Sequence, residues 1–446
     1  MKVKRWLLII ILMMCMSVST YHICSIRHAV SAHSRAPSYL LVAVYVVFSN
    51  IMLSDGLQAA QTEVSAVRPS VKTDRGVCPL PPAPTLPKAG GVFTDPTFGT
   101  EIMRVTDERD GKENCNAYSY WPSFNADNTR FHIACGNRHV LYSFDPEGFR
   151  LTEKELLFAR KPPSGHEPRW EDAMWAYADP NLLYCHEGLN LWAYNVVTGE
   201  YTLVKDFSNT FPAGHLCQLS KNSKDDVFAG SLQDLKWNRT GYFVWRRAAD
   251  KIVLRETVDH DEVQVDKTGR FCVVKTGRQG KEVVEVRVVD LHTGRIEDLT
   301  DDGPDFAPGH SDNGQGIVVG HDNVRNRVTF RRLDSPHDVR TLLDFKNDWS
   351  QDYHVSLLAD DETWATLSFY VGNSLPSSGI FRNEIVQVVT DGSGRVRRLA
   401  HHRSVFKTYW DSPRANISRD GRFIVFTSNW EGANQRDVFI LKVPAM

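Results

Sequence analysis

Apolar and polar residues alternate in short runs along most of the chain, and these runs recur in a fixed order. The last complete copy begins with an alternating run at 415–418, turns at Asp420-Gly421 and continues with a second run at 422–428. A third run follows at 436–443. An Asp-Gly pair between two β-branched or aromatic runs is the strongest short-range sign of a β-hairpin. This stretch therefore predicts an antiparallel unit of at least three strands.

The third strand of this unit has counterparts along the chain, each an alternating apolar run that ends at a turn. Seven copies occur, at residues 139–145, 189–195, 241–245, 284–290, 327–330, 384–389 and 438–441. Their spacing is roughly 40 to 60 residues, which is the range of propeller blades. A β-sandwich would not show this period. We therefore predict an all-β fold, a seven-bladed β-propeller over about residues 91–446.

The two ends of the predicted propeller complement each other. The chain stops after a third strand, and residues 101–106 (Glu-Ile-Met-Arg-Val-Thr) form a strand-like run with no hairpin partner nearby. An open ring would leave the edges of its terminal blades exposed. We therefore expect this N-terminal strand to complete the C-terminal blade and close the ring.

Residues 1–60 contain two apolar stretches, 6–16 and 39–53, each preceded by basic residues. Both are short for the ~20 residues that span a bilayer. The second leads into small residues near Ala60, which is typical of a cleaved export signal. The first is either an additional anchor or an extension from an upstream start site. We expect export to the periplasm or the cell exterior, with N-terminal membrane attachment left open. Residues 61–90 hold six prolines and are expected to form an extended linker.

Charge and cysteine content narrow the function classes. The chain has 52 Lys and Arg against 54 Asp and Glu, so nothing points to a nucleic-acid partner. It lacks a Cys-x-x-Cys motif, which argues against a zinc ribbon or a dithiol redox site. Some of the cysteines beyond residue 60 could pair in an exported protein, but Cys185 and Cys272 are equally consistent with single buried thiols in strands.

The start of each innermost strand is the most informative place to search for a site. In a propeller these positions converge at one mouth of the ring although they lie ~50 residues apart in sequence. Four consecutive predicted blades carry a histidine there: His215, His260, His310 and His354. A single histidine at such a position could simply cap its own blade. Four in register, beside Asp, Gly and Tyr, predict a polar funnel.

Two chemistries suit such a funnel. Neutral imidazoles of His260, His310 and His354 could hold a divalent metal such as zinc or manganese.

Alternatively, one histidine acts as a general base near neutral pH, with a tyrosine as acid and an arginine opposite a substrate carboxylate. The candidates for these roles are His215, Tyr120 or Tyr353, and Arg414. The tryptophans that could stack on sugars are Trp121, Trp170, Trp349 and Trp410, although tryptophan in a sheet more often packs between blades.

The segment 416–428 (Asn-Ile-Ser-Arg-Asp-Gly-Arg-Phe-Ile-Val-Phe-Thr-Ser) resembles the TolB-type propeller repeat, and 123–131 is a looser copy. In architecture and residue types the funnel resembles propeller polysaccharide lyases. The resemblance to oligogalacturonate lyases implies a metal bound by histidines, and that to ulvan lyases implies a His/Tyr pair with a basic residue. Both imply β-elimination on a uronate.

These observations favour an exported, carbohydrate-active propeller, most simply a monomer, that cleaves a uronate-containing poly- or oligosaccharide. The alternative is a non-enzymatic TolB-like envelope propeller that binds a protein or a glycan. An anionic carbohydrate or an envelope protein is therefore the expected partner. Propellers host many functions, so the fold alone does not decide between the two.

Overall fold

The computed structural model describes residues 71–279, 282–300, 308–346, 348–349, 352–371 and 379–445. They belong to one compact unit, Pro69–Met446. The predicted export segment, 1–60, and the first residues of the predicted linker lie outside the described residues. Among the described residues, no helix has both the length and the apolar character needed to cross a bilayer.

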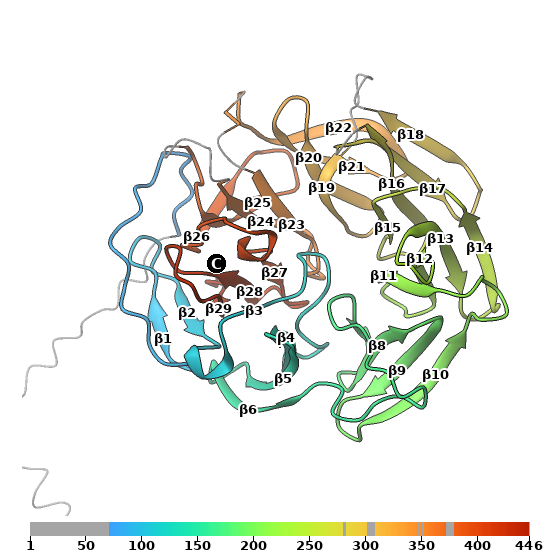
Figure 1. The fold of residues 1–446 in the computed structure, drawn as a ribbon. Coiled ribbons are helices and arrows are strands. Elements are labelled where there is room, and N and C mark those ends of the chain that lie inside the picture. Colours follow the sequence, from blue (N-terminus) through green and yellow to red (C-terminus); the bar gives the residue numbers. More distant parts are fainter. Residues whose placement is uncertain are drawn as a thin grey trace, which may run out of the picture. The chain divides into compact units, whose positions relative to one another are not determined.

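The described residues form seven antiparallel sheets that surround a common centre (Figure 1). The first blade contains β3 (Asn114–Cys115), β4 (Arg130–Cys135), β5 (Arg138–Asp145) and β6 (Arg150–Leu156). The second contains β7 (Met174–Trp175), β8 (Leu182–Glu187), β9 (Asn190–Asn195) and β10 (Glu200–Asp206). The third contains β11 (His215–Lys221), β12 (Val227–Gln233), β13 (Arg239–Arg246) and β14 (Lys251–Glu256).

The remaining blades repeat this order. The fourth contains β15 (Glu262–Val265), β16 (Phe271–Gln279), β17 (Glu282–Asp290) and β18 (Ile296–Thr300). The fifth contains β19 (Pro308–Asn313), β20 (Ile317–Asp322), β21 (Arg327–Arg332) and β22 (Ser335–Asp344). The sixth contains β23 (Asp352–Ser356), β24 (Trp364–Tyr370), β25 (Glu384–Val389) and β26 (Val396–His401). The seventh contains β27 (Asn416–Ile417), β28 (Phe423–Ser428) and β29 (Asp437–Lys442) together with two N-terminal strands. The predicted seven-bladed propeller is confirmed.

The N-terminal strands of the seventh sheet are β2 (Glu101–Arg104) and β1 (Val92–Thr94). β2 lies antiparallel to β29, with Met103 opposite Ile440. Beside this pairing, Arg104 Nη2 lies 2.6 Å from Asp437 Oδ2, and Thr106 Oγ1 donates to Asp437 Oδ1 at 3.0 Å. The strand expected at 101–106 thus occupies the fourth position of this sheet, and β1 adds a fifth strand outside it.

The hydrophobic core is divided among the blade interfaces. The buried apolar side chains of the described residues form seven clusters, each with members from neighbouring blades. Phe131 of the first blade and Phe423 of the seventh, for example, belong to the same cluster. Each sheet therefore buries both faces, which explains why its central strands contain so few polar residues.

Residues 71–90 differ from the free linker that the prolines suggest. The carbonyl of Lys72 accepts a hydrogen bond from the Arg398 backbone at 2.9 Å, and the carbonyl of Pro81 accepts one from Arg403 Nη2 at 2.9 Å. Proline keeps the segment extended and leaves its carbonyls free to accept. These residues therefore belong to the folded unit and line the sixth blade.

The six cysteines among the described residues are free thiols. Cys185 in β8 and Cys272 in β16 are fully buried. This agrees with their interpretation as single buried thiols in strands.

Candidate functional site

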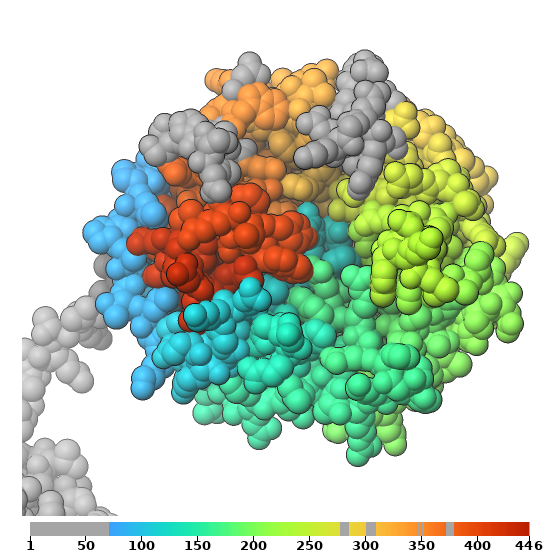
Figure 2. All heavy atoms as spheres, viewed as in Figure 1, coloured from blue at the N-terminus to red at the C-terminus, as the bar shows by residue number. Residues whose placement is uncertain are grey.

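A cavity of about 720 Å³ opens at the mouth where the innermost strands begin. Its polar wall includes Arg169, Arg239, Lys275, His310, His321 and Asp352. Its aromatic wall includes Tyr118, Tyr120, Trp121, Trp349 and Tyr409. On the face shown in Figure 2 the surface is hollowed near the centre, between the red C-terminal residues and the yellow-green residues of the third and fourth blades.

His310 is held in one orientation at this wall. Its Nδ1 lies 3.1 Å from the carbonyl oxygen of Tyr353 and 3.4 Å from Asp352 Oδ1. A carbonyl can only accept, so Nδ1 carries the proton and Nε2 of the neutral ring is unprotonated. The side chain is 35% exposed and lines the cavity. His310 therefore offers a basic nitrogen to whatever occupies the cavity.

Asp352 sets the charge state of this group. Withdrawal from water lowers the pKa of His310, but the Asp352 carboxylate outweighs this and the net shift is upward. For Asp352 itself, withdrawal from water raises the pKa, whereas His310, His321 and His354 lower it below its usual range. Tyr370 donates its hydroxyl to Asp352 Oδ2 at 2.9 Å. Asp352 is thus a fixed anion beside the imidazole.

Two further histidines pack around this pair. His354 stacks on His310 with ring centroids 4.7 Å apart, and on Tyr370 at 4.9 Å. Burial, together with His310, holds the pKa of His354 well below its usual value, so this ring is neutral. His321 donates from Nε2 to Asn326 Oδ1 at 3.0 Å, and burial lowers the pKa of His321 too.

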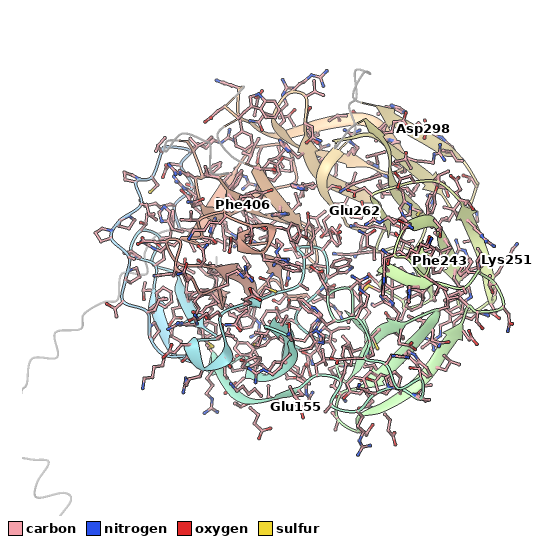
Figure 3. The ribbon with its side chains drawn as sticks, viewed as in Figure 1. Glu155, Phe243, Lys251, Glu262, Asp298 and Phe406 are labelled. Atoms are coloured by element: carbon pink, nitrogen blue, oxygen red, sulfur yellow. The ribbon has the colours of Figure 1, made fainter. Side chains whose placement is uncertain are left out.

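The cations of the wall differ in their availability. Lys275 Nζ lies 2.6 Å from Glu262 Oε2, and Glu262 projects from β15 near the centre of the ring (Figure 3). Arg239 Nη1 donates to the carbonyl of His260 at 2.8 Å. The exposed guanidinium of Arg169 makes no hydrogen bond to any residue that the structure describes. Arg169 is therefore the cation most open to an anionic ligand.

Tyr120 and Trp121 lie at the cavity wall as predicted, but the segment of the chain that places them there differs from the predicted one. They belong to an excursion between β3 and the isolated Phe124–Phe131 bridge, rather than preceding the first strand. Burial raises the pKa of Tyr120 well above its usual value, so its hydroxyl stays protonated. Trp121 donates Nε1–H to the carbonyl of Leu219 at 2.8 Å, which fixes its indole.

Three of the predicted site residues stack on or hydrogen-bond to other parts of the protein and do not line the cavity. His215 stacks flat on Trp237, with centroids 4.1 Å apart and planes at 2°. His260 is fully buried, and its Nε2 lies 2.7 Å from Ser231 Oγ. Tyr353 is buried and donates its hydroxyl to the carbonyl of Arg327 at 2.9 Å.

Arg414 lies behind the wall, and the exposed Trp410 and the half-buried Trp170 do not line the cavity. Arg414 is fully buried, lies 4.8 Å from the Trp410 ring centroid and approaches Glu171 Oε1 at 3.5 Å. Because it is fully buried, the Arg414 guanidinium does not reach the cavity. Trp170 stacks on His139 at 5.6 Å. Arg414 therefore supports Glu171, which does line the cavity.

The predicted metal ligands do not assemble. His310 and His354 stack, whereas His260 is hydrogen-bonded to Ser231. Within the described ranges, no group of three His, Cys, Asp or Glu side chains is arranged to hold a metal ion. The residues present thus do not fit a histidine-bound metal, and the chemistry below uses none.

The sequence reasoning missed His321, Lys275, Arg239 and Arg169. A usable signal existed for the first two, because the end of each second strand lies beside the start of the first. Lys275 is opposite Glu262 in the β15–β16 pair, and Asp322, which adjoins His321, is opposite Pro308 in the β19–β20 pair. Reading both strands at the mouth would have found them.

Neither a protein-family model nor a curated protein sequence matches this chain. Solved structures do. An oligogalacturonate lyase in complex with manganese matches with a TM-score of 0.59 and 12% identity, over 80% of this chain and 97% of that one. An oligogalacturonate lyase from Vibrio parahaemolyticus matches with a TM-score of 0.59 and 12% identity, over 79% and 96%. At this identity the likeness shows the fold, and the chain is similar to these lyases as a seven-bladed β-propeller.

Proposed function

We propose that this protein is exported and cleaves a uronate-containing poly- or oligosaccharide by β-elimination in the cavity at the blade mouths. One observation carries the proposal: His310 is fixed through Nδ1 beside the Asp352 anion and presents Nε2 to the cavity. The similarity in fold to structures named as oligogalacturonate lyases supports it.

The reaction assigns one role to each group. The base Nε2 of His310 takes the proton from the carbon next to the uronate carboxylate, and Asp352 stabilises the imidazolium that forms. The freed electron pair forms a carbon–carbon double bond as the bond to the glycosidic oxygen breaks. Tyr120, whose raised pKa keeps the hydroxyl protonated, gives its proton to the leaving oxygen. Arg169 offsets the carboxylate charge and so makes the first proton more acidic.

This assignment revises the roles inferred from sequence. His310 takes the place of His215 as base, because His215 stacks on Trp237 and does not line the cavity. Tyr120 is retained in preference to the buried Tyr353. Arg169 takes the place of Arg414, which is enclosed behind Glu171.

The test is a His310→Gln variant of the purified protein, incubated with polygalacturonate, alginate or hyaluronan. The unsaturated product absorbs in the ultraviolet, and wild type should form it from at least one polymer. We expect the variant to lose roughly 10²- to 10⁴-fold in turnover, as for loss of a general base, with an unchanged thermal unfolding midpoint.

His292→Gln is the matched control, because His292 is exposed on the turn after β17. It should turn over like wild type. Undiminished turnover of His310→Gln would remove His310 from the mechanism. Absence of unsaturated product from wild type with every polymer would reject the lyase proposal in favour of the envelope-binding alternative.

A further inference from the structure

A tightly held turn between β12 and β13 carries two of the most exposed apolar side chains of the described residues. Leu235 is 67% exposed and Trp237 is 57% exposed. The Asp234 carboxylate accepts from the backbone of Lys236 at 2.8 Å and of Asn238 at 2.9 Å. The backbone N–H of Trp237 donates to the Asp234 carbonyl at 3.0 Å. The turn is therefore built to hold these side chains out.

Trp237 has an unfavourable backbone conformation, with a φ of 67°. Left-handed backbone is uncommon for a bulky residue and occurs mainly in tight turns and at functional sites. No burial compensates here, since more than half of the side chain is exposed. One face of the indole lies flat on His215, at 4.1 Å and 2°. The structure thus supports the ring from behind and leaves the other face open.

This turn adjoins the cavity. Gln233 lines the cavity, and its Nε2 donates to the carbonyl of Trp237 at 3.2 Å. Arg239, two residues after Trp237, lines it as well. Lys236 and Arg239 stand one residue before and two residues after Trp237, so the sequence places a cationic side chain on either side of it. Leu235 and Trp237 are the two apolar side chains of a turn that otherwise carries Asp234, Lys236 and Asn238. The apolar area that two side chains expose is far smaller than the area buried in a stable protein–protein interface.

We propose that Trp237 is an outlying sugar-binding platform, which stacks on a pyranose ring of the same anionic polysaccharide beyond the units held in the cavity. The inference rests on the proposed function. The apolar C–H face of a pyranose matches a flat, supported indole, and the flanking cations suit uronate carboxylates. The protein then prefers a long chain to a short oligosaccharide, because only a long chain spans both the cavity and the turn.

The experiment compares Trp237→Ala and Trp237→Phe with wild type on polygalacturonate, alginate and hyaluronan, each as polymer and as the shortest oligosaccharide that wild type cleaves. Trp237→Ala should raise KM for the polymer roughly three- to ten-fold and leave kcat unchanged. KM for the oligosaccharide should not change. Trp237→Phe, which keeps a flat ring, should restore most of the polymer affinity.

Leu235→Ala is the matched control, because it removes exposed apolar surface from the same turn without removing a flat ring. It should leave both KM values unchanged. An unchanged polymer KM in Trp237→Ala, or an equal rise for polymer and oligosaccharide, would overturn the platform. An equal rise of the polymer KM in Leu235→Ala would show that the flat ring is not the feature that the polymer contacts, and would also overturn the platform. Wild type that cleaves none of the substrates would overturn the proposed function, and this inference with it.

Discussion

Asp352 governs His310 mainly through charge, so its removal should be visible in the pH dependence of turnover. Asp352 raises the pKa of His310, and the base works only above that pKa. In Asp352→Asn the pKa of His310 should fall, and the acidic limb of kcat/KM against pH should move to lower pH. Turnover at the plateau should also fall, because the imidazole is a weaker base. The control is Asp298→Asn, an exposed change on β18, which should leave the acidic limb of kcat/KM at the wild-type pH. If the acidic limb of Asp352→Asn also stays there, Asp352 does not set the pKa of His310.

Sequence could predict which positions reach the mouth, but not which way each side chain turns there. His310 and Tyr120 line the cavity as expected, whereas His215 and His260 do not. Side chains of a strand alternate between its two sides, so one residue of register decides between cavity and blade interface. β11 carries a register irregularity between Cys217 and Ser220, which no local pattern reveals. For the same reason the assignment of Tyr353 to the funnel has no support in the structure.

At the scale of single elements, Arg398 on β26 joins the N-terminal segment to the sixth blade. It is buried, its Nη2 lies 2.5 Å from Glu384 Oε1, and its Nη1 lies 3.1 Å from Asp74 Oδ1. Arg398→Ala leaves the Glu384 carboxylate buried without its partner, which costs about 3–5 kcal/mol of unfolding free energy. Chemical denaturation measures this. Arg395→Ala, which removes an exposed pair with Asp391, should change it by no more than about 1 kcal/mol. A similar small loss in both variants would show that the buried Arg398–Glu384 pair adds little to stability.

The elements themselves were predictable to different degrees. Third strands are long alternating runs and were found in all seven blades. First strands are harder, because β3, β7 and β27 contain two residues each and little alternation. The segment 71–90 was expected to be an extended linker. Composition predicts the extension, but not that its carbonyls accept hydrogen bonds from Arg398 and Arg403, which are distant in sequence. Contacts between residues more than 300 positions apart leave no local trace in a single sequence.

At the scale of the whole molecule, the spacing of the strands along the sequence is enough to predict a closed ring of seven blades. Seven repeats at propeller spacing require each blade to bury both faces against its neighbours, and seven interfacial clusters are found among the described residues. The cavity could not be predicted in the same way. Its volume and its cations depend on loops and strand ends whose lengths vary from blade to blade, and these carry no period.

Three histidines buried between or behind the blades link the stability of the ring to pH. Burial lowers the pKa of His132 to about 3, and burial is also the main cause that lowers the pKa values of His401 and His402 to about 4. Each ring is neutral in the folded protein and becomes protonated below about pH 6.5 once unfolded. Stability from each is therefore complete above pH 6.5 and is lost on acidification towards the folded pKa. Between pH 5.5 and 4, each should reduce the unfolding free energy by up to about 1.4 kcal/mol per pH unit. In His132→Leu this slope should fall by about that amount, whatever the change in stability at neutral pH, whereas His292→Leu should keep the wild-type slope. Denaturant titrations at several pH values measure it, and equal slopes in wild type and His132→Leu would mean that His132 titrates normally in the folded ring.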